Sequence, residues 1–299
     1  MNKLAIITDS SCNLDSKLQK EYGVDYVLPM HITFNGIEYD ANGDWVDFSP
    51  KEYYDMMRNG AIGKSSKINS HEYEEAFKKF LDAGYDILSI SCTGALSASV
   101  KESIIASEAL SPLYPNQRIR CVDSANCHFS LAMIIKEADR QRKDGIDVDD
   151  IVTWIENNKL YFNEVGTVET LVYLRKAGRI SASKAFFGGM LSVKPIVVYD
   201  RVGNNVAVDR RHGRRNSLEG ICSYIEKYAD INYKPIIYIA HGDCEQDALL
   251  VRDIIQSKYE KQIEFVFGNI EPGIGSSVGP GTIILAFYGS PEIRDLNDK

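Results

Sequence analysis

Four clusters of small hydroxyl residues are the part of this sequence best suited to chemistry. They are Thr8-Asp9-Ser10-Ser11, Lys64-Ser65-Ser66-Lys67, the loop from Ser91 to Ser97, and Val122-Asp123-Ser124. Three of them follow strand-like apolar runs and precede helical patterns, which predicts a position at the carboxyl ends of strands, where open α/β sheets bind ligands. Hydroxyls and helix N-terminal amides are donors that suit a carboxylate or phosphate. Helix capping is the structural alternative for each cluster.

A glycine-rich segment near the end of the chain matches the G-x-S-x-G pattern of a hydrolase nucleophile elbow, with Ser277 at its centre. An elbow joins a strand to a helix, whereas Gly279-Pro280-Gly281 leads into an apolar run over 282–288 that predicts a strand. The last histidine, His241, precedes Ser277, so no histidine follows this serine. The dinucleotide-binding fingerprint G-x-G-x-x-G would need glycine at position 278, where this sequence has Val278. The sequence also has no Walker A motif. A hydrolase or nucleotide-binding enzyme is therefore disfavoured.

A basic group lies around Gly178 in an otherwise acidic protein, and consists of Arg175, Lys176 and Arg179. A guanidinium there can neutralise an anion held by the hydroxyl clusters. A basic helix C-terminus capped by Gly178 explains the same residues equally well. The segment His241-Gly242-Asp243 follows a predicted strand, and we interpret Asp243 as a helix N-cap.

Length and composition restrict the class of protein. A chain of 299 residues predicts two domains, and a formal net charge of −8 argues against nucleic acid as a partner. The six cysteines form no C-x-x-C pair, which is typical of free thiols in a reducing compartment, and no metal site is expected. No apolar run reaches the roughly 20 residues of a membrane span, and the N-terminal run is too short for a signal peptide. We therefore expect a cytoplasmic protein.

Strand and helix patterns alternate along the chain and predict the α/β class with two domains. We expect residues 1–160 to form a three-layer α/β/α domain with a mainly parallel sheet, and residues 161–299 to form a mixed sheet flanked by helices. Ser49-Pro50-Lys51-Glu52 predicts a capping box, and Asn35-Gly36 predicts a hairpin turn. The expected strands of the second half are 194–199, 206–208, 235–240, 263–266 and 282–288, and the expected helices before it include 130–143 and 148–158.

Eight short motifs in order along nearly the whole chain resemble the DegV family. They are Thr8-Asp9-Ser10, Lys64-Ser65-Ser66, Leu96-Ser97, Val122-Asp123-Ser124, Leu174 to Ser181, Lys194-Pro195-Ile196, His241-Gly242 and Gly279-Pro280-Gly281. The resemblance implies a two-domain bacterial protein without catalytic activity or cofactor. It also implies a long-chain fatty acid between the domains, with its carboxylate held by hydroxyls of the first domain and its acyl chain covered by the second.

The resemblance also implies residues for the carboxylate site. Ser65 and Ser66 match the family's hydroxyl pair, Thr93 and Ser97 lie in its hydroxyl-rich loop, and Arg179 matches the arginine of its Gly-Arg-Ile motif. Ser277 stands where many members carry a histidine. Some members present the fatty acid to a separate fatty acid kinase subunit, which makes such a kinase an expected partner, and transient membrane contact is compatible with a lipid ligand.

Two departures from the family pattern bear on these expectations. Ser277 replaces the histidine beside the head group, and the loop from Ser91 to Ser99 differs from the commoner Ser-Ser-x-Leu-Ser-Gly-Thr. A carrier outside the kinase system therefore remains an alternative. So does an enzyme acting on a small acyl or phosphorylated substrate, with Ser277, His241 or Asp9 as its reactive groups.

Overall fold

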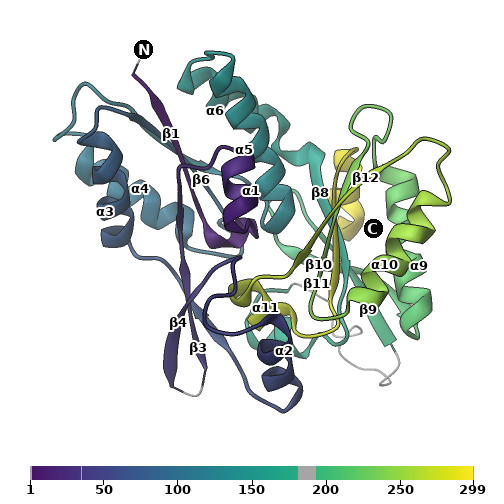
Figure 1. Ribbon diagram of the computed structural model, residues 1–299. Helices are drawn as coiled ribbons and strands as arrows, with labels where there is room; N and C mark the ends of the chain where they lie inside the picture. Colours follow the sequence, from purple (N-terminus) through teal and green to yellow (C-terminus); the bar gives the residue numbers. More distant parts are fainter. Residues whose placement is uncertain (1, 35, 181–192, 299) are drawn as a thin grey trace.

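Four parallel strands form the first sheet, here called sheet A, in the computed structural model shown in Figure 1. The structure describes residues 2–34, 36–180 and 193–298. In spatial order, the strands of sheet A are β2 (Tyr26–Leu28), β1 (Leu4–Asp9), β6 (Asp86–Ser91) and β7 (Ile119–Asp123). Because all four run parallel, the three hydroxyl clusters that follow β1, β6 and β7 lie at one edge of the sheet, as predicted.

Helices cover both faces of sheet A because side chains on a strand alternate between faces. Ile6 belongs to a core with residues of α5 and α6, whereas Ile7 belongs to a core with residues of α3 and α4. The first face carries α1 (Ser16–Glu21), α5 (His128–Lys143) and α6 (Val148–Asn158); the second carries α3 (Ser70–Leu81) and α4 (Ser99–Leu110). The predicted three-layer α/β/α arrangement is confirmed.

A small antiparallel sheet, sheet B, extends from this half and consists of β4 (Ile37–Ala41), β3 (Met30–Phe34) and β5 (Lys64–Ser66). Phe34 pairs with Ile37, so the predicted hairpin is confirmed, although Asn35 lies outside the described residues. The helix α2 (Pro50–Arg58) begins with the predicted capping box of Ser49 and Glu52. The Lys64-Ser65-Ser66 cluster forms the short strand β5 itself.

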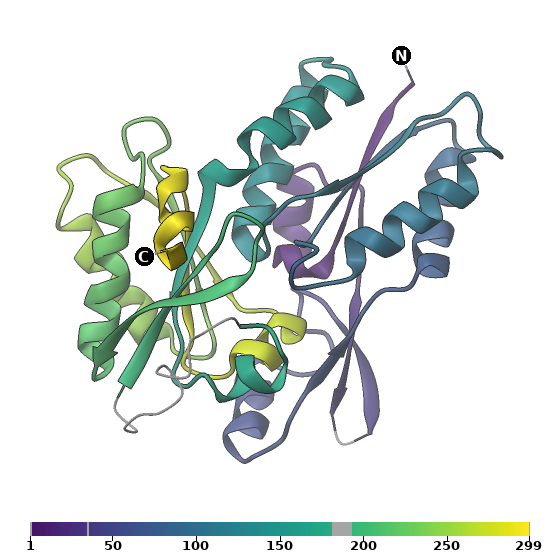
Figure 2. The same ribbon diagram turned by 180° about the vertical axis from the view of Figure 1, so that it is seen from behind.

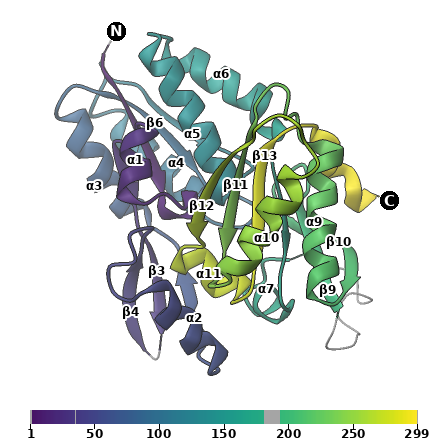
Figure 3. The same cartoon turned by 45° about the vertical axis from the view of Figure 1, so that its right-hand side comes forward.

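Six strands form the mixed sheet C of the second half. In spatial order they are β10 (Asn205–His212), β9 (Val193–Tyr199), β8 (Phe162–Thr167), β13 (Ile283–Tyr288), β11 (Ile236–His241) and β12 (Glu264–Asn269). Only β11 and β12 pair in parallel among the described strands of this sheet. Two helices, α9 (Arg214–Tyr228) and α10 (Glu245–Gln256), cover its outer face (Figure 3). The predicted mixed sheet flanked by helices is confirmed.

Helix α5 packs between sheets A and C, and joins the two halves. Its buried residues share one hydrophobic core with Ile6 and Leu88 of sheet A and with Phe162 and Ala286 of sheet C. Figure 2 shows this helix between the two sheets from behind. The strands of sheets A and B come from residues 4–123 and those of sheet C from residues 162–288, but the apolar core runs through both groups.

Short elements complete the description. They are the 3₁₀ turns η1 (Ser10–Cys12), η2 (Lys159–Tyr161) and η3 (Pro291–Asp298), and the helices α7 (Val172–Lys176) and α11 (Pro272–Val278). From η3, the buried Arg294 reaches back to the carbonyls of Phe162 and Ala125, at 2.7 and 3.0 Å. None of the described helices is both long and apolar enough to cross a bilayer.

Candidate functional site

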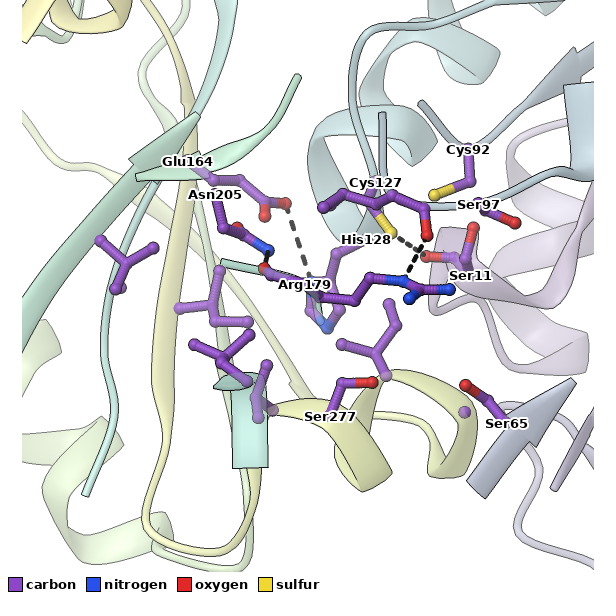
Figure 4. Close-up of a pocket in the computed structure, with 18 of the residues that line it drawn as sticks. Ser11, Ser65, Cys92, Ser97, Cys127, His128, Glu164, Arg179, Asn205 and Ser277 are labelled. Atoms are coloured by element: carbon purple, nitrogen blue, oxygen red, sulfur yellow. Dashed lines mark hydrogen bonds and ion pairs between the residues drawn. The ribbon is translucent and has the colours of Figure 1, made fainter. Parts of the chain in front are cut away.

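A cavity of about 290 Å³ lies where the edges of sheets A, B and C meet (Figure 4). Its wall combines β5, the loop after β6, the start of α5, strands β8 and β9, and helix α11. Apolar side chains form much of that wall; they include Leu96, Val168, Leu174, Val197, Ile274 and Ile284. An apolar cavity with a few polar groups is the usual form of a small-molecule site.

Ser65 on β5 and Ser277 on α11 both line the cavity, and Figure 4 shows their hydroxyls pointing toward each other. Gly63 permits this arrangement, because a Cβ there would lie 2.6 Å from the Phe34 ring and 3.1 Å from the Cβ of Ser276. Only a residue without a side chain lets the chain enter β5 so close to α11. Ser66 also lines the cavity.

The loop after β6 contributes one of its two predicted residues to the cavity. Ser97 lines it and exchanges a hydrogen bond of 2.9 Å with the hydroxyl of Ser99. Thr93 is fully buried outside the lining: its hydroxyl donates to the carbonyl of Val202 at 3.0 Å and accepts the N–H of Ala95 at 3.2 Å. Thr93 therefore holds the loop against the turn before β10 instead of facing the cavity.

Arg179 lines the cavity from the segment that follows α7. Its Nε donates to the carbonyl of Leu96 at 2.7 Å and its Nη1 to the carbonyl of Ala177, also at 2.7 Å. The residues before it form the predicted basic helix end, since α7 ends at Lys176 and Gly178 has a φ of +66°. The structure thus brings Ser65, Ser66, Ser97, Arg179 and Ser277 to one cavity.

A buried polar group on another wall of the cavity was not predicted. It consists of His128 at the start of α5, Glu164 on β8 and Tyr199 on β9. The Tyr199 hydroxyl donates to Glu164 at 3.0 Å, and the Ser130 N–H donates to the same carboxyl at 3.0 Å. The available signal was a charged residue inside a strand-like run, Phe162-Asn163-Glu164-Val165.

Burial shifts the pKa of both ionisable groups in this polar group toward their neutral forms. Desolvation raises the pKa of Glu164 to about 8, although its two hydrogen bonds oppose the shift. Desolvation also lowers the pKa of His128 to about 3. At neutral pH the imidazole is uncharged and the carboxyl is largely protonated, so this wall is polar without carrying a net charge.

The residues considered for catalysis do not assemble into a catalytic site. Asp9 lies outside the cavity lining and accepts the N–H groups of Cys92 and Ser11, at 3.0 and 3.2 Å. The Nδ1 of His241 accepts the N–H of Cys244 at 3.3 Å. Ser277 lies in the last turn of α11, not at a strand-to-helix turn, so the elbow geometry is absent at this serine.

The interpretation of Asp243 as an N-cap is wrong. The cap of α10 is Cys244, which makes no side-chain capping bond, and Asp243 has a φ of +52°. Its carboxylate accepts a hydrogen bond from Arg58 of α2 instead. Asp243 therefore fixes a contact between the two halves.

Among the described residues, no group of three or more His, Cys, Asp or Glu side chains is placed to hold a metal ion.

The family model of the DegV proteins matches residues 3–289 of this chain. The chain belongs to the DegV family. A DegV domain-containing protein of Clostridium perfringens is 32% identical over 289 residues, which cover 97% of this chain and 98% of the relative. Another from Caldanaerobacter subterraneus is 25% identical over 280 residues, 94% of this chain and 96% of the relative.

Solved structures of DegV proteins share the fold. A stearic acid-binding protein from Eubacterium ventriosum superimposes with a TM-score of 0.85 at 23% identity, covering 98% of this chain and all of the other. A fatty acid-binding DegV protein from Thermus thermophilus gives 0.85 at 22% identity, covering 97% of this chain and all of the other. A DegV protein from Eubacterium eligens loaded with heptadecanoic acid gives 0.80 at 16% identity, with 96% and 100% coverage.

Proposed function

We propose that this DegV protein binds a long-chain fatty acid in the cavity between its sheets. The observation that carries the proposal is the cavity itself, which has an apolar wall and hydroxyl groups at one side. An acyl chain gains about 0.8 kcal/mol for each CH₂ removed from water, whereas a carboxylate must recover the hydrogen bonds that it loses. Affinity then comes from the tail, and orientation from the polar groups. DegV structures with stearic and heptadecanoic acid support the same ligand class.

The proposed carboxylate site consists of Ser65, Ser66, Ser97, Arg179 and Ser277. Ser65 and Ser277 face each other from two elements, so a carboxylate between them would accept from both hydroxyls. The lining contains two positively charged residues, Arg179 and Lys67, and Lys67 is already paired with Glu102. Thr93 is left out of this site because its hydroxyl already donates to Val202.

We propose binding and presentation of the fatty acid, rather than its chemical conversion, as the role of the protein. Asp9 and His241 are held by backbone hydrogen bonds and do not line the cavity. We further propose a separate kinase as the partner that receives the ligand, a cytoplasmic location, and a division of the chain near residue 160. The free state of all six cysteines supports a reducing compartment.

Native mass spectrometry of protein purified from a bacterial host tests the ligand directly. We expect an added mass of a long-chain fatty acid, and an increase in melting temperature when delipidated protein receives stearic acid, because a ligand that binds the folded state stabilises it. Octanoic acid is the matched control, since it has the same head group and a shorter tail. Absence of both an acyl mass and a thermal shift would reject the proposal.

A further inference from the structure

The side chain of Asn205, at the start of β10, holds the main chain of Arg179. Its Nδ2 donates to the carbonyl of Arg179 at 3.0 Å, and Figure 4 shows the Asn205 amide beside that carbonyl. Asn205 pairs with Tyr199 across the antiparallel strands β9 and β10, so the two side chains project from the same face of sheet C. Both residues line the cavity. The amide therefore holds Arg179 at the cavity itself.

Arg179 is fixed on both sides of its Cα and along its side chain. Its N–H donates to the carbonyl of Leu174 at 2.9 Å, which ties it to the end of α7, and its own carbonyl accepts from Asn205. Its Nε donates to the carbonyl of Leu96 at 2.7 Å. A guanidinium has more N–H groups than these contacts use, so donors remain for an anion.

The turn that carries Asn205 is anchored to the first half of the chain. The Thr93 hydroxyl donates to the carbonyl of Val202 in this turn at 3.0 Å. Gly203 lets the turn approach so closely, because a Cβ there would lie 2.2 Å from the Thr93 hydroxyl oxygen. Leu96 belongs to the same loop as Thr93. The loop after β6, the turn before β10 and the segment after α7 thus form a closed ring of hydrogen bonds.

Such a ring matters for a guanidinium because its N–H groups are directional. A strong, charge-assisted hydrogen bond to a carboxylate requires a planar guanidinium in the right orientation. Arg179 is an exposed residue, and an exposed arginine loses side-chain entropy when it pairs with an anion. Holding the residue in place before the ligand arrives reduces that cost.

We propose that Asn205 is a positioning residue for the head group of the bound fatty acid: it fixes the main chain of Arg179 so that the guanidinium faces the carboxylate. The inference rests on the proposed function, which assigns Arg179 to the carboxylate site. Because Asn205 acts through Arg179, its effect depends on that guanidinium and on the charge of the ligand. A residue that only maintains the cavity wall would affect charged and uncharged ligands alike.

A double-mutant cycle tests the dependence on Arg179. Stearic acid is titrated into delipidated wild-type protein, Asn205→Ala, Arg179→Ala and the double variant. We expect Asn205→Ala alone to weaken binding about fivefold, the effect of one lost hydrogen bond. In the Arg179→Ala background the same change should alter affinity by less than about twofold, because the two residues act as one unit. Losses that multiply in the double variant would overturn the inference.

Stearyl alcohol tests the dependence on charge, since it has the same chain and an uncharged head group. Asn205→Ala should change its affinity by less than about twofold, because a hydroxyl gains little from an oriented guanidinium compared with a carboxylate. An equal loss for the acid and the alcohol would show damage to the wall and would overturn the inference. Should Asn205→Ala lower the melting temperature too far for titration, Asn205→Leu, which keeps a similar volume without the donor, replaces it.

Asn204→Ala is the matched control. It removes the same side chain from the adjacent residue, whose amide donates to Asp200 at 2.9 Å inside the turn. Asp200 still accepts the N–H of Val202, so the turn should persist and stearic acid binding should stay within about twofold of wild type. Equal losses in Asn204→Ala and Asn205→Ala would overturn the inference. Absence of stearic acid binding by the wild-type protein would instead reject the proposed function itself.

Discussion

The Nε of Arg179 donates a hydrogen bond of 2.7 Å to the carbonyl of Leu96, and so joins the segment after α7 to the loop after β6. Both residues line the cavity, Arg179 with a largely exposed side chain. The guanidinium is thus held near the proposed carboxylate site by main-chain acceptors, with donors to spare.

Arg179→Ala is expected to weaken fatty acid binding about tenfold, because hydrogen bonds to charged groups contribute about 1.5–3 kcal/mol. The change should leave the melting temperature nearly unchanged, since the side chain is exposed. Lys176→Ala is the matched control: it removes the same charge from the same segment at a residue outside the lining. Equal losses of affinity in the two variants would show a general charge effect rather than a site.

Ser65→Ala is expected to weaken fatty acid binding more than Ser66→Ala. Neighbouring residues on a strand point to opposite faces, and the Ser65 hydroxyl is the one that points toward Ser277 (Figure 4). Isothermal titration calorimetry with stearic acid checks the order. A larger effect of Ser66→Ala would move the carboxylate to the other face of β5.

Removing the hydroxyl of Tyr53 or Tyr54 is expected to destabilise the protein. Both are fully buried on α2, and they donate to the carbonyls of Pro272 and Ile270, at 2.6 and 2.8 Å. Each Tyr→Phe change removes a buried hydrogen bond and should lower the free energy of unfolding by about 1 kcal/mol. Urea unfolding measures this change in the free energy of unfolding. Tyr39→Phe, a half-buried tyrosine that packs on Phe48 nearby, should change stability by less than about 0.5 kcal/mol.

The raised pKa of Glu164 predicts a pH dependence of stability. The folded protein keeps this proton up to a pKa of about 8, whereas the unfolded chain loses it near the ordinary value of 4.5. At Glu164 the folded state therefore binds more protons between these values, which lowers stability as the pH rises. The lowered pKa of His128 has the opposite effect up to its ordinary value of 6.5, so the net fall, about 2 kcal/mol from Glu164, should appear between about pH 6.5 and 8. Glu164→Gln, which stays uncharged, should flatten the profile.

Urea unfolding of both proteins at intervals of pH measures this dependence. Burial also raises the pKa of Glu271 to about 8, so part of the decline should persist in Glu164→Gln. An identical slope in the two proteins would mean that Glu164 is ionised in the folded state at neutral pH.

Most of the fold was predictable because periodic apolar patterns and caps determine single elements. The capping box at Ser49, the hairpin after Phe34 and the strand-to-helix order of sheet A all depend on neighbours in sequence. Asp243 was misassigned for the opposite reason, since its partner Arg58 lies 185 residues away. No local pattern contains that contact.

The candidate site was predictable only in part, for the same reason: local motifs identify single residues, but not contacts between residues far apart in the sequence. Short motifs led to Ser65 and Arg179, both of which line the cavity. Thr93 belongs to the same kind of hydroxyl loop, but Gly203 packs against it and its hydroxyl serves the turn of Val202. His128 and Glu164 meet only because α5 crosses β8, so neither residue carries a signal that identifies the other.

The position of α5 between the two sheets has a consequence for how this protein denatures. One apolar core contains residues of sheet A, α5 and sheet C, and Arg294 joins the last turn of the chain to Phe162 and Ala125. Separating the halves would expose one apolar face of that helix, together with the sheet surface that it covers. The two sheets should therefore melt in one cooperative transition, with calorimetric and van't Hoff enthalpies that agree, despite a length at which independent domains are common.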